Sequence, residues 1–252
     1  MSEFLFPTEV ISLPSEGKYY PVGHPLRDNG GKLEIKYMTA KEEDILTSAN
    51  LINNDVVFDK FLESLIVHEG VNYFDLTTGD ISAIFIASRV LAYGKNYAAD
   101  VTCGHCDHNA EYMIDLTELE SPDDLIDGDE NGHYEFGTDT GLTITIKPLT
   151  RGDEVQLAKD QKATNLVNSN ITSNRMTSRL KKIVVAVDGK TDRGELHTII
   201  ENLVVRDTNK IREEANNINP SIDTTMELSC VSCDQVIKGG IPIGADFFWP
   251  NL

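Results

Sequence analysis

Two spacings of apolar residues run through this chain, and both occur in each half of the sequence. Alternation of apolar and polar residues predicts strands over residues 33–37 and 142–149. Apolar residues three and four positions apart predict a series of helices. These helices cover residues 40–48, 55–68, 78–93, 151–163, 176–187, 193–203 and 208–216. The combination indicates a fold of the α+β class.

Capping residues support the predicted helix ends in the first half. Thr39 and Glu42 form a capping box, in which each side chain accepts a hydrogen bond from an otherwise unpaired backbone N–H. Thr77 and Asp80 make a second start of the same kind. Gly94 follows the third helix and is well suited to end it, because glycine tolerates the left-handed backbone of a helix terminus.

Residues 1–30 contain four prolines, which exclude a continuous helix or a central strand. We therefore predict an extended N-terminal arm with a turn at Gly17. Its apolar side chains either fold back on the chain's own core or lie on a neighbouring subunit, and the sequence supports both interpretations equally. In the second case the contact residues would be Phe4, Phe6, Leu13, Tyr19 and Tyr20.

Residues 117–141 carry nine acidic side chains and no lysine or arginine. Such a run of like charges is typical of a solvated loop, so we predict an acidic connection between the two halves. The apolar residues Leu125, Ile126, Tyr134 and Phe136 indicate that parts of this connection still pack against the body.

All four cysteines belong to two Cys-x-x-Cys pairs, Cys103 with Cys106 and Cys230 with Cys233. Each pair lies between two segments with strand character, so we expect each at the tip of a hairpin. Two thiolates separated by two residues can bind one metal ion, and two such pairs complete a tetrahedral zinc site. We predict one structural Zn²⁺ per chain bound by these four residues.

Other roles for the cysteines fit less well. The two pairs lie much further apart than the ~15–20 residues of a compact zinc ribbon. Redox dithiols would need a thioredoxin-like βαβ context, which neither pair has, and a reducing cytosol would not maintain disulfides. His105 and His108 could each replace a thiolate, although four cysteines are sufficient for the site.

The two halves repeat one order of elements: a strand, three helices and a Cys-x-x-Cys hairpin. The junctions at Thr39 and Thr150 are 111 residues apart and the cysteine pairs are 127 apart, so the second copy carries insertions. We predict two similar lobes joined by a shared zinc ion. The predicted parts are the arm (1–30), the first lobe (31–116), the acidic connection (117–141) and the second lobe (142–252).

The formal net charge of −19 weighs against nucleic-acid binding, which depends on lysine and arginine to neutralise phosphates. Neither cysteine pair has a basic cluster beside it. No apolar run approaches the ~20 residues of a membrane span, and the first residues lack the pattern of a signal peptide. These features predict a protein of a reducing cell interior that does not enter a membrane.

The C-terminal segment gathers Phe247, Phe248 and Trp249, the only tryptophan of the chain. This cluster either packs on its own core or docks on a partner, and in the second case all three are contact residues. The sequence lacks the common catalytic motifs, and four cysteine ligands would leave zinc no open position for a substrate. We therefore do not expect an enzyme.

Several short motifs occur together along the chain. They are Leu-Pro-Ser-x-Gly-x-x-Tyr-Pro at 13–21, Lys-Tyr-Met-Thr-Ala-Lys-Glu-Glu-Asp at 36–44, Arg-x-x-x-Tyr-Gly-x-x-Tyr at 89–97, the two cysteine pairs, and Phe-Phe-Trp-Pro at 247–250. This combination resembles the T4-type baseplate protein family of contractile-tailed bacteriophages. The resemblance spans nearly the whole chain.

The resemblance implies a protein of the baseplate hub region that is made in the host cytoplasm and is needed for tail assembly. We expect a structural adaptor, present in several copies, that joins hub, wedge or tail proteins through its arm and its aromatic tail. The alternatives are a transient assembly chaperone absent from the virion and a zinc-dependent nucleic-acid-binding protein. Arg89 and Tyr93, one helical turn apart, are expected to stack and support the first cysteine pair.

Overall fold

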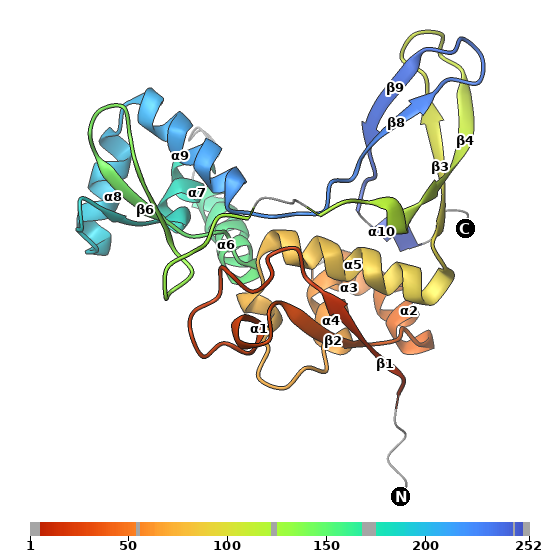
Figure 1. Cartoon of the computed structure of the whole chain (residues 1–252), viewed down its shortest axis with the longest axis horizontal. Helices are drawn as coiled ribbons and strands as arrows, with labels where there is room; N and C mark the ends of the chain where they lie inside the picture. The colour runs from red at the N-terminus through yellow and green to blue at the C-terminus, as the bar shows by residue number, and fades with distance from the viewer. Residues whose placement is uncertain (1–5, 54–55, 122–124, 168–174, 244, 249–252) are drawn as a thin grey trace, which may run out of the picture.

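The computed structural model describes residues 6–53, 56–121, 125–167, 175–243 and 245–248 (Figure 1). Within these residues, helices combine with small antiparallel sheets, which confirms the α+β class. In the part of the chain described, no helix has both the length and the apolar character needed to cross a bilayer.

The chain up to the first cysteine pair forms a small sheet and a group of helices. The elements are β1 (Thr8–Ser12), α1 (Pro25–Asp28), β2 (Lys32–Lys36), α2 (Ala40–Thr47), α3 (Ala49–Asn53), α4 (Val57–Leu65), the 3-10 turn η1 (Tyr73–Asp75) and α5 (Thr78–Tyr93). β1 pairs antiparallel with β2, so that Ile11 lies opposite Leu33. A bridge between Ile35 and Ile66 brings the end of α4 beside β2.

The rest of the chain contains a three-stranded sheet, four longer helices and two ribbons. The elements are β3 (Asn96–Thr102), β4 (Asn109–Asp115), η2 (Leu116–Glu118), β5 (Tyr134–Gly137), β6 (Thr143–Ile146), α6 (Arg151–Val167), α7 (Arg175–Ile183), β7 (Val184–Val187), α8 (Arg193–Asn202), α9 (Val205–Asn217), β8 (Thr225–Ser229), β9 (Val236–Gly240) and α10 (Ala245–Phe248). β5, β6 and β7 form one antiparallel sheet, whereas β3–β4 and β8–β9 are separate antiparallel ribbons.

The helix ends of the first half agree with the predicted caps. Thr39 and Glu42 form the capping box of α2, and the Thr77 hydroxyl accepts a hydrogen bond from the Asp80 N–H at the start of α5. Gly94 ends α5 with a φ of +85°, a conformation that glycine adopts without steric cost. Local side-chain chemistry therefore decides where these helices begin and end.

Buried side chains form two hydrophobic clusters. The first core lies among β2, α2, α4 and α5 and contains Phe61 and Ile84, both fully buried. The second core lies among β6, β7, α7, α8 and α9 and contains Ile144 and Leu196. Figure 1 shows the helices of the second core at one end of the molecule and the two ribbons at the other.

Two elements of the second half differ from the prediction. The helix expected over 176–187 ends at Ile183, and Val184–Val187 form β7. This run of mostly β-branched residues favours a strand, and β6 supplies its pairing partner. The acidic connection contains β5, because Tyr134 and Phe136 pack on the second core.

The N-terminal segment, predicted as an extended arm, is part of the body instead. Leu13, Tyr20 and Leu26 are buried in the first core, and Tyr19 is buried in the second. The Leu13 N–H donates to the Gly31 carbonyl oxygen at 2.9 Å, which closes the segment into a loop. Prolines prevent long regular elements here, but they do not prevent the apolar side chains between them from packing.

The C-terminal segment crosses back from the second core to the first. After α9 the chain passes over the start of α5 and then forms β8–β9 beside β3–β4 (Figure 1). A Cβ atom on Gly79 would lie 1.8 Å from the Pro220 carbonyl oxygen, so the crossing requires a glycine there. Phe247 and Phe248 end the crossing in the first core. The described residues after Pro220 therefore pack with the first core, unlike the predicted second lobe.

A buried carboxylate ties the N-terminal loop to α5. Asp80 accepts hydrogen bonds from the Tyr20 hydroxyl at 2.6 Å and from the Ser15 N–H at 3.1 Å. The Tyr20 oxygen in turn accepts from the Thr77 N–H at 3.2 Å. Burial raises the pKa of Asp80, so its charge is costly at neutral pH and these donors reduce that cost.

The two cores meet around the start of α6. The Arg151 Nε donates to Asp59 Oδ1 of α4 at 2.6 Å, and the Arg151 N–H donates to the Leu76 carbonyl oxygen. An antiparallel bridge joins Thr77 to Thr150. Backbone and charged contacts therefore hold the second core against the first.

We expect Tyr20→Phe to lower the free energy of unfolding by about 2–3 kcal/mol, because the buried Asp80 carboxylate keeps only the Ser15 N–H of its two described donors and the Thr77 N–H loses its acceptor. Urea unfolding followed by circular dichroism measures the change. Tyr37→Phe is the matched control, since the Tyr37 hydroxyl contacts Glu9 at the surface. Equal stability of the two variants would contradict a structural role for the buried network.

Candidate metal centre

The two cysteine pairs lie in the turns of the two ribbons. β3 and β4 are paired up to Thr102 and Asn109, and β8 and β9 are paired up to Ser229 and Val236. The ribbons stand side by side with their turns at the same end (Figure 1). The Tyr112 hydroxyl donates to the Ser229 carbonyl oxygen at 3.3 Å, which links one ribbon to the other.

Both turns have the same backbone geometry. Asp107 has a φ of +55° and Asp234 a φ of +56°, and each N–H donates at 2.9 Å to the carbonyl oxygen of the first cysteine of its pair. Aspartate is one of the residues that tolerate this left-handed conformation. The turns are thus related as two copies of one structure that face each other.

The four sulfurs form a compact cluster. Cys103 Sγ lies 3.8 Å from Cys233 Sγ, Cys106 Sγ lies 3.7 Å from Cys230 Sγ, and all four atoms lie within 4.8 Å of one another. Zinc–sulfur bonds of about 2.3 Å in a tetrahedron place sulfurs about 3.8 Å apart. The arrangement is therefore compatible with a tetrahedral zinc site.

Backbone donors prepare two of the sulfurs for binding a cation. The Ser232 N–H lies 3.4 Å from Cys230 Sγ and lowers the pKa of that thiol to about 7. The His105 N–H does the same at Cys103 and lowers its pKa. Since thiolates are the metal-binding form, these contacts favour a bound cation.

The fourth thiol shows why the cluster suits a cation. The Gln235 N–H lowers the pKa of Cys233, but burial and the neighbouring thiols outweigh it and raise the pKa to about 12. Four thiolates this close together repel one another, so all of them can be charged only with a positive ion between them. Such a site, with four protein ligands, leaves no open coordination position.

The histidines beside the first pair do not join this cluster. The group of side chains able to hold a metal, among the residues described, consists of the four cysteines alone. Cys103 and Cys230 are buried, whereas Cys106 is exposed and Cys233 is half-buried. The first cysteine of each pair therefore faces the ribbons, and the second lies nearer to solvent.

The structure places most of the predicted contact residues in the interior. Five of the eight are at most 5% exposed and pack on the chain's own cores, as in the alternative in which both segments fold back on the body. These five are Leu13, Tyr19, Tyr20, Phe247 and Phe248. Phe6 remains 46% exposed, whereas Phe4 and Trp249 lie outside the described residues.

Arg89 connects the base of the first ribbon to the C-terminal helix. Its guanidinium lies 5.8 Å from the centre of the Tyr93 ring, as the sequence suggested, and 5.0 Å from that of Tyr97 in β3. Its Nε donates to the Phe247 carbonyl oxygen at 2.8 Å. One cation therefore holds α5, β3 and α10 together, and burial lowers its pKa.

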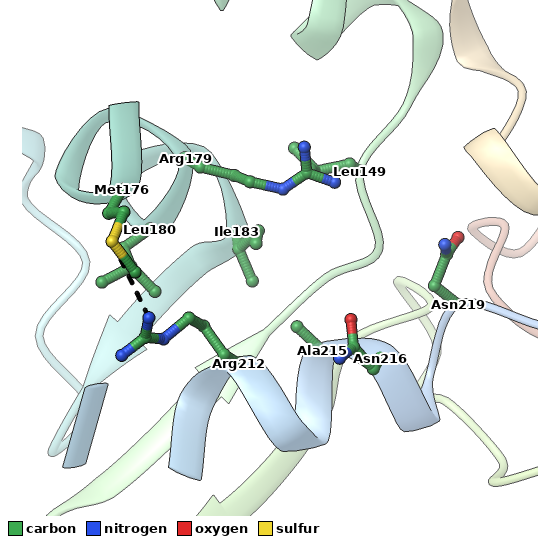
Figure 2. A pocket seen from close by; sticks show the side chains of 9 residues that line it. All are labelled: Leu149, Met176, Arg179, Leu180, Ile183, Arg212, Ala215, Asn216 and Asn219. Carbon is green, nitrogen blue, oxygen red and sulfur yellow. Dashed lines mark hydrogen bonds between the residues drawn. The ribbon is translucent and has the colours of Figure 1, made fainter. Parts of the chain in front are cut away.

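A groove between α7 and α9 was not predicted from the sequence. Figure 2 shows Met176 and Arg179 on one side and Arg212 on the other, and the cavity has a volume of about 310 Å³. The available signal was the composition of α7, in which four of nine residues are basic in a chain of net charge −19.

Comparison with known proteins identifies a family. The family described as T4 bacteriophage base plate protein matches residues 8–249, which is nearly the whole chain. No curated protein and no solved structure matches the sequence.

We expect the purified chain to contain about one zinc ion, measured by plasma mass spectrometry after gel filtration. Cys103→Ser and Cys230→Ser should lose the ion and should unfold at a lower temperature, because each removes a ligand from a closed site. Removal of zinc from the wild-type chain with a chelator should lower its unfolding temperature in the same way.

His105→Ala is the matched control, since it lies in the same turn but outside the sulfur cluster. It should keep both the ion and the stability. A wild-type chain without zinc, or a cysteine variant that retains it, would contradict the predicted site.

Proposed function

Because the chain belongs to the T4 bacteriophage base plate protein family, we propose that it is a structural adaptor in the hub region of a contractile phage tail. The match over residues 8–249 is the observation that carries this proposal. The family itself implies association with other baseplate or tail proteins. We propose further that the chain is made in the host cytoplasm and joins neighbouring hub, wedge or tail subunits in several copies, without catalysis.

Zinc has a mechanical role in this proposal. One Zn²⁺ bound by Cys103, Cys106, Cys230 and Cys233 would hold the two ribbons together at their tips. The short sulfur distances and the matching turns support this assignment. Since the ribbons are joined to the body at their bases, a cross-link at their tips would make the pair a stiff projection.

The proposed body consists of two related units, each of which contributes one ribbon. Ile35 pairs with Ile66 beside the first core, and Ile144 pairs with Val187 beside the second, in each case across a helical segment. Lys36 forms an ion pair with Glu42, six residues later in the chain. The corresponding ion pair in the second unit joins Lys147 to Asp153, which are also six residues apart. These correspondences support an internal duplication in which the ribbon of the second unit, β8–β9, lies beside the ribbon of the first unit, β3–β4.

Two surfaces have the exposed apolar character expected of subunit contacts. β1 pairs only with β2 among the described strands; Phe6, just before β1, is 46% exposed and Val10, within it, is 58% exposed. At the ribbon tips Val231 is 69% exposed and Val236 is 51% exposed. An unpaired strand edge can accept a strand from a neighbour, so we propose β1 as a contact element. Phe4 and Trp249 remain predicted contact residues.

The alternative function is a transient assembly chaperone that leaves before the tail is complete. Quantitative mass spectrometry of purified phage particles separates the two. We expect the chain in a fixed ratio to the other baseplate proteins, because an adaptor is a permanent part of the assembly. Its absence from particles whose assembly nevertheless depends on it would overturn the adaptor proposal in favour of the chaperone.

We expect Val10→Lys to reduce incorporation into particles by at least about fivefold, because a charge on the outer face of β1 opposes burial in an interface. The free energy of unfolding should change by less than about 0.5 kcal/mol, since Val10 is exposed in the isolated chain. Val22→Lys is the matched control, because Val22 is 67% exposed and lies outside β1. Equal incorporation of both variants would count against β1 as a contact element.

A further inference from the structure

Charge is distributed very unevenly along this chain. Residues 142–220, which include β6 to α9, contain 13 lysines and arginines against 10 aspartates and glutamates. The remaining residues contain 9 basic and 31 acidic side chains. The segment from β6 to α9 is thus slightly basic, whereas the rest of the chain, including β5 on the same sheet, is strongly acidic. An acidic partner would be repelled by most of the protein and tolerated at this end.

The groove between α7 and α9 lies in this basic part. Its floor is apolar and is formed by Leu149, Leu180 and Ile183, which are at most 5% exposed and belong to the second core. Its volume of about 310 Å³ is at the lower end of the range for ligand pockets, so it suits one or two side chains. Figure 2 shows α7 and α9 as its opposite walls.

Each wall carries an arginine that has no carboxylate partner among the described residues. Arg179 is exposed on α7 and forms no hydrogen bond or ion pair with them. Arg212 on α9 donates to the Thr208 carbonyl oxygen at 3.1 Å and to Asn209 Oδ1, and it contacts Met176 Sδ at 3.8 Å, so its described partners are all neutral. The neighbouring carboxylates, Glu213 and Glu214, are instead paired with Lys210.

We propose that this groove binds a short segment of another baseplate protein in which an apolar side chain is flanked by aspartate or glutamate. The apolar side chain enters between α7 and α9 and covers the exposed part of the floor. The flanking carboxylates then pair with the Arg179 and Arg212 guanidiniums, whose planar donors suit a carboxylate. The identity of the partner as a baseplate protein rests on the proposed function, but the chemistry of the groove does not.

Other occupants fit the groove less well. A nucleic acid would have to approach a chain of net charge −19, and the narrow apolar floor has no counterpart on a phosphate backbone. A basic segment would meet two arginines that have no carboxylate partner among the described residues, and it would find more favourable surfaces on the acidic part. The combination of an apolar floor with a cation on each wall therefore selects an acidic and apolar segment.

A random library of displayed peptides of about ten residues, selected against the immobilised full chain, tests this proposal. We expect the selected peptides to share an apolar residue flanked by acidic residues. Fluorescence anisotropy of the selected peptides should show binding that weakens with salt and falls at least tenfold in Arg179→Glu. Ala215→Leu, which fills part of the groove without changing charge, should weaken binding as well.

Arg206→Glu is the matched control, because it makes the same charge change at an exposed site on α9 outside the groove. It should bind the peptides like the wild-type chain, and thermal unfolding should show all three variants folded. Selection of no shared pattern, selection of basic peptides, or equal loss in Arg206→Glu and Arg179→Glu would overturn the proposal.

Two further outcomes would assign the groove to a different occupant and overturn the proposal. One is self-association of the chain that Arg179→Glu abolishes, seen by light scattering. The other is binding of a DNA duplex that Arg179→Glu abolishes. The peptide selection uses the purified chain without particles, so a failed selection would not contradict the adaptor role. Absence of the chain from particles, in turn, would not contradict the proposed peptide preference of the groove.

Discussion

The return of the C-terminal segment to the first core is the constraint on which the rest of this structure depends. Phe247 and Phe248 are both buried in the first core, where Phe248 packs against Phe61, and the Arg89 guanidinium donates to the Phe247 carbonyl oxygen. Because this end of the chain is fixed there, β8–β9 must run alongside β3–β4. That path brings the four cysteine sulfurs within 4.8 Å of one another. The geometry of the candidate metal centre therefore depends in part on two phenylalanines that pack in the first core.

The same path explains why the two hydrophobic clusters behave as one body. The crossing segment passes so close to Gly79 that any side chain there would collide with Pro220. The N-terminal loop adds a second connection, since Tyr20 is buried in one core and Tyr19 in the other. Both connections converge on the start of α5. The start of α5 is therefore the point at which the two cores are joined.

Local chemistry could be read from the sequence, and long-range packing could not. The Thr39 and Thr77 caps were predictable because each depends on side chains within one turn, and the α+β class followed from apolar spacing. The cysteine pairs could be grouped by elimination, since no other thiols were available. In contrast, the sequence of an aromatic segment does not show whether its side chains pack on a partner or on the chain's own core. Only the fold shows that Tyr20 contacts Asp80 and that Phe248 lies against Phe61. β7 was mistaken for helix because its pairing partner, β6, lies about 40 residues earlier in the chain.

Arg89 and Phe247 are 158 residues apart in the sequence, and this separation affects the order in which the fold forms during synthesis. During synthesis the first core emerges from the ribosome long before the phenylalanines that complete it, and Phe61 and Phe85 then lack part of their covering. A chain that ends before Cys230 lacks Phe247 and Phe248 as well as two of the four cysteines, so it can form neither the complete aromatic cluster nor the sulfur cluster. The fold thus makes the stability of an early segment depend on a late one, since the first core is covered only after residues 247 and 248 have been synthesised.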